Sequence, residues 1–143
     1  MAAPRSSSGH WVRAFSSGLL AEIATIVAIV ITVQIYRRMV APGLADATYA
    51  AFGVRAGGVI GVIGGTIFTF VFAHALMSRL INRFIGHGLV VAAGAILLQL
   101  AGSLAGHGGF PYMYVVADLL KLGAGWLAGF LAQRRLLVPV GGG

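Results

Sequence analysis

Apolar residues occur along this chain in four long blocks, with short polar segments between them. The blocks cover about residues 15–36, 54–77, 84–106 and 112–133. An α-helix needs about 20 residues to cross a hydrocarbon core of about 30 Å, and each block is close to that length. The pattern therefore predicts an all-α membrane protein, a bundle of four transmembrane helices with short connections.

The polar segments that flank the blocks are short. Residues 1–14 form a basic N-terminal segment, and residues 134–143 form a C-terminal tail. The first segment and the apolar block after it resemble a signal peptide, but that block ends in Tyr36-Arg37-Arg38 without the small-residue pattern of a cleavage site. We therefore expect the segment to remain part of the protein.

The connections between the blocks have the composition of turns. In the first, residues 37–53, the sequence favours a short interfacial helix over residues 44–52 that is started by Asp46 or a neighbour. The other two connections are predicted to be turns, at residues 78–83 and 106–111.

The composition indicates which solvent the blocks need. Hydrophobic residues make up 59% of the chain and charged residues 9%, whereas about 25% of the residues in a soluble domain are charged. So few charges do not cover a surface that faces water. Lipid is therefore the expected solvent, and the lipid bilayer is the first expected partner.

The formal net charge is +7, and most of the basic residues lie at the ends of the apolar blocks. Arginines in that position meet lipid headgroups and set orientation, so we interpret the charge as a topology signal and expect no nucleic acid partner. The side that carries both termini has six arginines: Arg5, Arg13, Arg79, Arg83, Arg134 and Arg135. The other side has three: Arg37, Arg38 and Arg55. By the positive-inside rule, we expect both termini in the cytoplasm and the protein in a bacterial inner membrane.

The chain lacks the sequence features of standard enzymes. Cysteine is absent, which excludes disulfides, thiolate metal sites and thiol catalysis. The motifs G-x-S-x-G, H-E-x-x-H and Walker A do not occur, so a standard hydrolase, zinc protease or nucleotide-driven pump lacks its machinery. His74, His87 and His107 lie near block ends, and we do not expect them to ligate a haem or chlorin. We therefore predict that the protein is not an enzyme and has no catalytic residues, metal or cofactor.

Small residues recur at every fourth position of the second block. Gly57, Gly61 and Gly65 begin this stripe and lie along one helix face. Such a stripe lets another helix approach closely, because van der Waals contact drives helix association in lipid. In the fourth block, Gly125 and Gly129 have the same spacing of four residues. We expect close helix contacts at these glycines within the bundle, and contacts between copies are the alternative.

A few polar side chains fall inside the blocks, and they are the candidate functional residues. An ionisable one costs about 2.5–3.5 kcal/mol if it faces lipid at mid-depth, so it is expected to face protein or water. Asp118 and Lys121 lie three residues apart on one helix face and can pair directly. At a rise of about 1.5 Å per residue, Gln99 reaches the height of Asp118, and Glu22 comes within about 8 Å of the height of Lys121. We therefore predict a hydrogen bond between Gln99 and Asp118, and a common interior for Glu22 and Lys121.

Glu22 also begins a polar stripe that continues with Thr25 and Thr32. One interpretation is a proton- or cation-responsive carboxylate in a cavity. The alternative is a carboxylate that is paired with Lys121 or with an arginine of the cytoplasmic side. The candidate intramembrane polar cluster consists of Glu22, Thr25, Gln99, Asp118 and Lys121.

The segment Leu20-Ala21-Glu22-Ile23 resembles the first-helix carboxylate region of the small multidrug resistance transporters. Those proteins also have four short helices, and they use small residues of the fourth helix for dimer contacts. The resemblance covers this patch and the number of helices. The chain differs in its basic N-terminal segment, its charged pair in the fourth block and the lack of the family's third-helix tryptophan and tyrosine pattern, so we do not assign it to that family.

The polar cluster and the small-residue stripes favour two different functions. The cluster favours an oligomeric transporter or channel-like protein, because four helices of this length enclose little volume alone. The stripes favour a non-catalytic accessory or assembly subunit that docks on a larger membrane complex. The partners expected besides lipid are therefore further copies of this chain or the subunits of such a complex.

Overall fold

The computed structural model describes residues 8–80, 83–105 and 112–137. The helices are α1 (Ser8–Ile35), the π-helical turn η1 (Tyr36–Val40), α2 (Asp46–Met77), α3 (Phe84–Ala105) and α4 (Tyr112–Leu137). The described residues contain no β-strand. Each of α1 to α4 is long and apolar enough to cross a membrane. The prediction of an all-α bundle of four such helices is confirmed.

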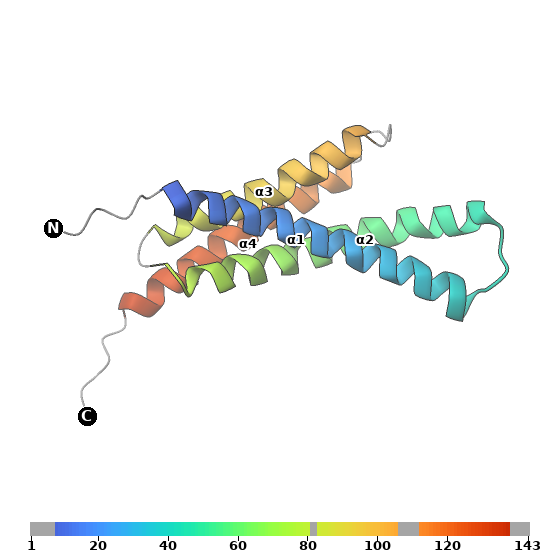
Figure 1. The fold of residues 1–143 in the computed structure, drawn as a ribbon, viewed down its shortest axis with the longest axis horizontal. Helices are drawn as coiled ribbons and strands as arrows, with labels where there is room; N and C mark the ends of the chain where they lie inside the picture. Colours follow the sequence, from blue (N-terminus) through green and yellow to red (C-terminus); the bar gives the residue numbers. More distant parts are fainter. Residues whose placement is uncertain (1–7, 81–82, 106–111, 138–143) are drawn as a thin grey trace, which may run out of the picture.

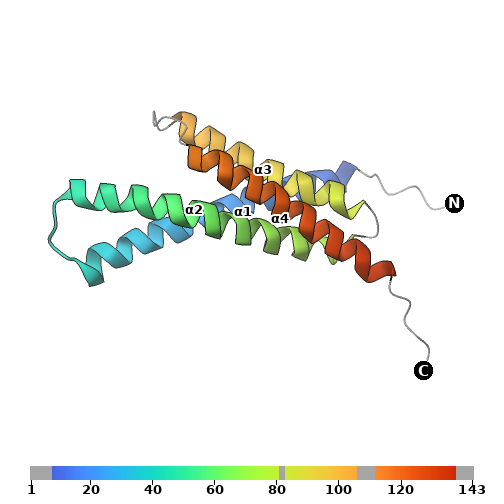
Figure 2. The same ribbon diagram turned by 180° about the vertical axis from the view of Figure 1, so that it is seen from behind.

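The helices form two hairpins, α1–α2 and α3–α4, that pack across each other (Figure 1). Both α1 and α4 contact α2 and α3, so α1 and α4 lie diagonally across the bundle. The start of α1 and the end of α4 lie at the same end of the bundle. Toward the other end the two hairpins diverge, which the view from behind also shows (Figure 2).

Small side chains fill the interior where the hairpins cross. Ala14, Ala73, Val91 and Ala128 come one from each helix and form a buried cluster. Large apolar side chains are exposed on all four helices, among them Ile23, Ile31, Ile63, Leu97 and Leu119. A soluble protein buries such side chains, so this distribution fits a multi-pass membrane protein whose outer surface meets lipid.

Glycines allow α3 and α4 to touch through their backbones. A β-carbon on Gly88 or on Gly125 would clash with the carbonyl group of the other glycine, and a β-carbon on Gly129 would lie 2.6 Å from the Cα atom of Ile85. Gly125 and Gly129 therefore do lie at a close helix contact, as the sequence predicts.

The contact between α1 and α3 depends on two further glycines. A β-carbon on Gly18 would clash with the Val91 carbonyl group, and one on Gly94 would lie 2.6 Å from the Phe15 carbonyl oxygen. Sequence reasoning missed these two residues because no other glycine lies four residues away from either of them.

The close contact predicted for Gly57 and Gly61 within the bundle is wrong. A β-carbon on either residue would meet nothing within 4 Å, whereas one on Gly65 would lie 2.8 Å from the Cε atom of Lys121. The physical reason is the divergence of the hairpins. The stripe is covered from Gly65 onward, whereas Gly57 and Gly61 have no helix packed on them among the described residues.

The short helix predicted over residues 44–52 is not a separate element. A helix does begin at Asp46, but it continues through Gly53 to Met77. A glycine inside a helix costs only about 1 kcal/mol relative to alanine, and contacts around the hairpin tip oppose a break. The Phe52 ring stacks on Tyr36 at 3.9 Å, and the Tyr49 hydroxyl donates to the Ala41 carbonyl oxygen at 2.8 Å.

The described helices also extend beyond the predicted blocks at both chain ends. The part of the N-terminal segment from Ser8 onward belongs to α1, and α4 runs to Leu137 in the predicted C-terminal tail. The predicted turn at residues 106–111 lies outside the described residues.

Candidate functional site

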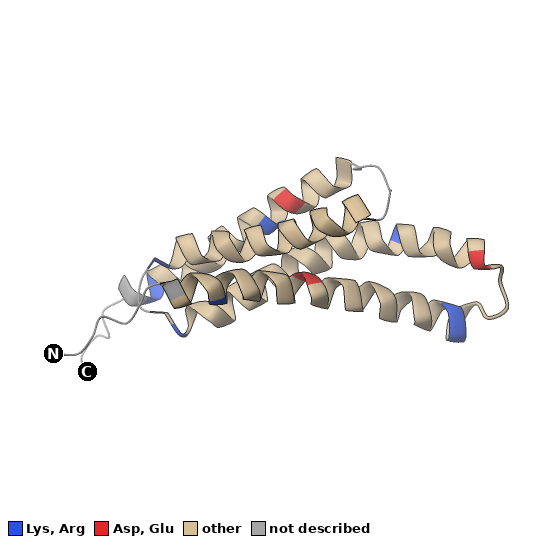
Figure 3. Cartoon of the chain, turned by 45° about the horizontal axis from the view of Figure 1, so that its top comes forward, with Lys and Arg blue, Asp and Glu red and all other residues tan. Residues whose placement is uncertain are grey.

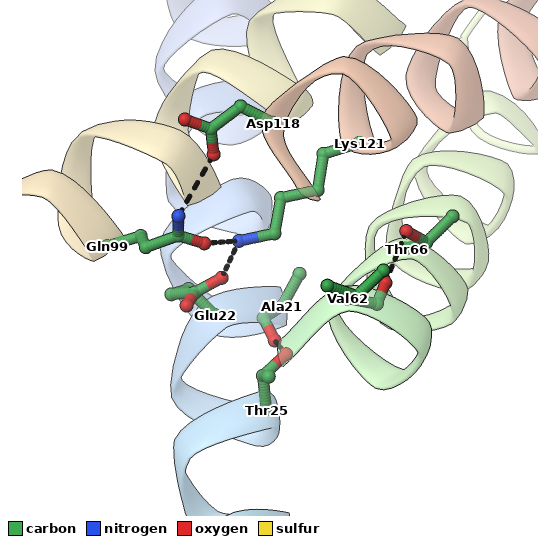
Figure 4. Close-up of polar contacts among 8 residues, drawn as sticks. All are labelled: Ala21, Glu22, Thr25, Val62, Thr66, Gln99, Asp118 and Lys121. Carbon is green, nitrogen blue, oxygen red and sulfur yellow. Dashed lines mark hydrogen bonds and ion pairs between the residues drawn. The ribbon is translucent and has the colours of Figure 1, made fainter. Parts of the chain in front are cut away.

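A lysine lies buried near the middle of the bundle. The Lys121 side chain of α4 has no exposed surface, and its Nζ atom lies 2.6 Å from the Oε2 atom of Glu22 on α1. The Glu22 residue is itself 5% exposed. The two helices are diagonal to each other, so the extended lysine side chain crosses the interior to reach its partner (Figure 4). The prediction that Glu22 and Lys121 face a common interior is confirmed.

Gln99 of α3 connects this ion pair to a second carboxylate. The Lys121 Nζ atom also donates a hydrogen bond to the Gln99 Oε1 atom. At the other side of the amide, the Gln99 Nε2 atom donates to the Asp118 Oδ1 atom at 3.1 Å (Figure 4). We call Glu22, Gln99, Asp118 and Lys121 the polar network. The predicted Gln99–Asp118 hydrogen bond is present, and Asp118 reaches Lys121 through Gln99; among the described residues, the ion pair of Lys121 is with Glu22.

The helix α2 contributes to this site a residue that has no side chain, Gly65. At Gly65 of α2, a β-carbon would lie 2.8 Å from the Lys121 Cε atom and 3.7 Å from the Thr25 Oγ1 atom. Gly65 therefore leaves room for the lysine side chain. All four helices take part in the site, three by side chains and α2 by this glycine.

The polar stripe on α1 is satisfied within its own helix. The Thr25 hydroxyl donates to the Ala21 carbonyl oxygen at 3.0 Å, and the Thr32 hydroxyl donates to the Ala28 carbonyl oxygen at 2.8 Å. Thr25 is buried, yet it makes no hydrogen bond to the polar network in Figure 4. With Glu22 paired to Lys121, the stripe matches the paired-carboxylate alternative.

The polar network holds two carboxylates and one ammonium group. Glu22 directly contacts Lys121, whereas Asp118 contacts the neutral amide of Gln99. If both carboxylates are ionised, the polar network carries two negative charges against the single positive charge of Lys121. An uncompensated charge inside a membrane span is costly. The arrangement is therefore chemically able to take up one proton or one cation at the Asp118 carboxylate.

One buried histidine was not anticipated. His87 is 3% exposed and stacks on the Trp11 indole with ring centroids 4.2 Å apart. Its Nδ1 atom lies 2.9 Å from the Arg83 carbonyl oxygen, and because a carbonyl only accepts, Nδ1 carries the proton. The only sequence signal for this contact is the spacing of four between Arg83 and His87.

The remaining histidines do not form a ligand set. His10 lies edge-on to His87 with ring centroids 6.4 Å apart, and His74 stacks on Phe70 with ring centroids 5.7 Å apart. His107 lies outside the described residues. Within the described ranges, no group of three or more histidine, aspartate or glutamate side chains is placed to hold a metal ion.

Comparisons with protein-family models, with curated proteins and with solved structures give no significant match to this chain.

Proposed function

We propose that this chain is a small transporter or channel-like protein that works as an oligomer and responds to a proton or cation at Asp118. The observation that carries the proposal is the composition of the polar network, in which two carboxylates share one lysine. Buried ionisable groups within membrane spans commonly belong to ion pathways or proton relays. If the charges of the network only stabilised the fold, the Lys121–Glu22 pair would be enough and the Asp118 carboxylate would not be needed.

Asp118 is the better candidate for the responsive group than Glu22. The Glu22 carboxylate has a direct cationic partner at 2.6 Å, whereas Asp118 is half-buried and held by one neutral hydrogen-bond donor, Gln99. Protonation of Asp118 leaves the Lys121–Glu22 pair intact. The group can therefore change its charge without breaking the bundle.

We propose an oligomer because the centre of a single bundle leaves no room for an ion path. Lys121 fills the interior at the height of Gly65, and the alanine and valine cluster fills it where the helices cross. An ion path that passes Asp118 would then run along the outer surface of α3 and α4. A second copy of this chain would have to enclose it there.

The proposal is tested by ion flux in liposomes that contain the purified protein. We expect these liposomes to dissipate an imposed H⁺ or Na⁺ gradient faster than protein-free liposomes, followed by dyes trapped inside. Asp118→Asn keeps an oxygen that can accept from Gln99 but removes the charge, so flux should fall toward the protein-free rate while thermal stability in detergent stays close to that of the parent. Arg55→Gln, an exposed change near the hairpin tip, serves as the control and should leave flux unchanged.

A specific observation favours the second candidate function, an accessory or assembly subunit. The α2 face at Gly57 and Gly61 is open to close approach, because a β-carbon there meets nothing within 4 Å. A helix of a larger complex could dock on this face. Flux no faster than in protein-free liposomes, together with stable co-purification of a larger membrane partner, would contradict the transporter proposal and favour this one.

Both termini are proposed to lie in the cytoplasm. Basic residues gather at the bundle end that holds the start of α1 and the end of α4, and others lie at the tip of the α1–α2 hairpin (Figure 3). Five described arginines are at the first end: Arg13, Arg79, Arg83, Arg134 and Arg135. Arg37 and Arg38 are at the tip and Arg55 lies further along α2, so five arginines against three favour cytoplasmic termini by the positive-inside rule. A reporter active only in the cytoplasm should work when fused to either terminus, and activity of an export-dependent reporter there would reverse the orientation.

A further inference from the structure

The arginines at the terminal end of the bundle have no acidic side chain to pair with. The chain contains three acidic residues. Asp46 pairs with Arg37 at the opposite end, Glu22 pairs with Lys121, and Asp118 accepts from Gln99. The five described arginines of the terminal end are all exposed. Their counter-charge must therefore come from outside the side chains of this protein.

A hollow lies among three helices at this end. It has a volume of about 500 Å³ and is lined by Trp11 of α1, by Arg83 and the first residues of α3, and by a glutamine near the end of α4: Trp11, Arg83, Phe84, Ile85, Gly86 and Gln133. Its walls combine two aromatic rings and an isoleucine with one guanidinium and one amide side chain. Such a mixture suits a molecule with an anionic head and an apolar tail.

The start of α3 adds backbone donors to the hollow. The first N–H groups of a helix have no partner within the helix, and Phe84, Ile85 and Gly86 occupy these positions. The His87 N–H and ring Nδ1–H both donate to the Arg83 carbonyl oxygen, at 3.1 and 2.9 Å. Arg83 itself has φ +54°, in the left-handed region.

A buried histidine next to the hollow is incompletely bonded. The His87 Nε2 atom is buried without a hydrogen-bond partner among the described residues, which is uncommon in folded proteins. His87 stacks on Trp11, whose ring lines the hollow and packs against Gly86, where a β-carbon would lie 3.2 Å from the Trp11 Cη2 atom. The Trp11 wall of the hollow is therefore backed by a histidine whose Nε2 atom is unpaired among the described residues, although His87 itself does not line the hollow.

We propose that this hollow binds the phosphate group of an anionic phospholipid. The Arg83 guanidinium supplies the charge, the Gln133 amide and the N–H groups at the start of α3 supply hydrogen bonds, and Trp11 lies at the membrane interface, where indole rings are favoured. A lipid is proposed rather than free phosphate because Phe84 and Ile85 line the hollow and exposed Leu89 follows one turn further along α3. Acyl chains can continue along that surface.

The experiment measures thermal unfolding of the full chain in a mild non-ionic detergent, with dioleoyl phosphatidylglycerol, dioleoyl phosphatidylcholine or inorganic phosphate added. A ligand that binds only the folded state raises the melting temperature with its concentration. We expect a saturable rise with phosphatidylglycerol and no such rise with the other two. An equal rise with phosphatidylcholine would overturn the preference for an anionic headgroup, and an equal rise with inorganic phosphate at the same concentration would overturn the assignment to a lipid.

Arg83→Gly separates binding from folding. Glycine adopts a positive φ without strain, so the variant should be at least as stable as the parent without lipid. Loss of a charge-assisted contact should weaken the apparent affinity for phosphatidylglycerol about tenfold. Gln133→Ala, an exposed change in the last turns of α4, should weaken it severalfold.

Arg79→Gln is the matched control, because it removes the same charge at the same end of the bundle from a residue that does not line the hollow. Its apparent affinity should stay within about twofold of the parent's, a difference of about 0.4 kcal/mol. If Arg79→Gln weakened binding as much as Arg83→Gly, attraction would be spread over the whole basic end and the proposed site would not exist.

Discussion

Lys121→Met is expected to destabilise the bundle by about 3–5 kcal/mol, the usual effect of removing one partner of a buried ion pair. Methionine matches the length of the lysine stem and keeps the contact with Gly65. It leaves the Glu22 carboxylate, 5% exposed, without its cation, and it removes a donor from Gln99. The free energy of unfolding in mild detergent, from chemical or thermal denaturation, measures the effect.

The same measurement on combined variants tests the coupling. When Lys121→Met is joined with Glu22→Gln and Asp118→Asn, no net charge remains in the network, and part of the lost stability should return. The triple variant is therefore expected to be more stable than Lys121→Met alone. Strict additivity of the three changes would mean that these residues are not coupled, and the network would lose its role in both folding and function.

Gly125→Ala should destabilise the protein by about 1–3 kcal/mol, the typical effect of forcing an extra methylene into a packed interior. Its β-carbon would clash with the Gly88 carbonyl group, and backbone atoms at a helix contact have no rotamer by which to move aside. Gly123→Ala, two residues away on the same helix, is the matched control. A β-carbon there meets nothing within 4 Å, so this change should be neutral or stabilising by up to about 1 kcal/mol.

Melting temperatures of the two variants in the same detergent give the comparison. A lower melting temperature for Gly125→Ala, or its failure to fold while Gly123→Ala folds, agrees with a backbone contact between α3 and α4. Equal melting temperatures would show that α3 and α4 do not approach at Gly88 and Gly125 as described.

The contacts that the sequence predicted correctly are those that depend on how deep each residue lies in the membrane. The rise per residue of a helix is nearly constant, so span lengths fix how deep each polar residue lies. That was enough to bring Gln99 to Asp118 and Lys121 to Glu22. It did not show that Gln99 stands between Asp118 and the lysine, because side-chain direction depends on helix rotation.

The predictions that failed depend on lateral arrangement. Gly57 and Gly61 have the correct spacing for a packed stripe, but the hairpins diverge where they lie. Conversely, Gly18 and Gly94 meet although no other glycine lies four residues away from either of them. His87 lies near the end of a span in the sequence, yet it is buried, with Trp11 of α1 stacked on its ring. Crossing angles and covering side chains come from the whole bundle and leave no local sequence pattern.

The two hairpins differ in length, and this affects how they fit a bilayer. The 32 residues of α2 extend about 48 Å, whereas the 22 residues of α3 extend about 33 Å. A hydrocarbon core of about 30 Å accommodates α3 nearly upright, while α2 must tilt or project into the headgroup layer. At any bilayer thickness α2 exceeds the hydrocarbon core by about 15 Å more than α3 does, so the two hairpins must meet the membrane with different tilts, which agrees with their divergence in Figure 1.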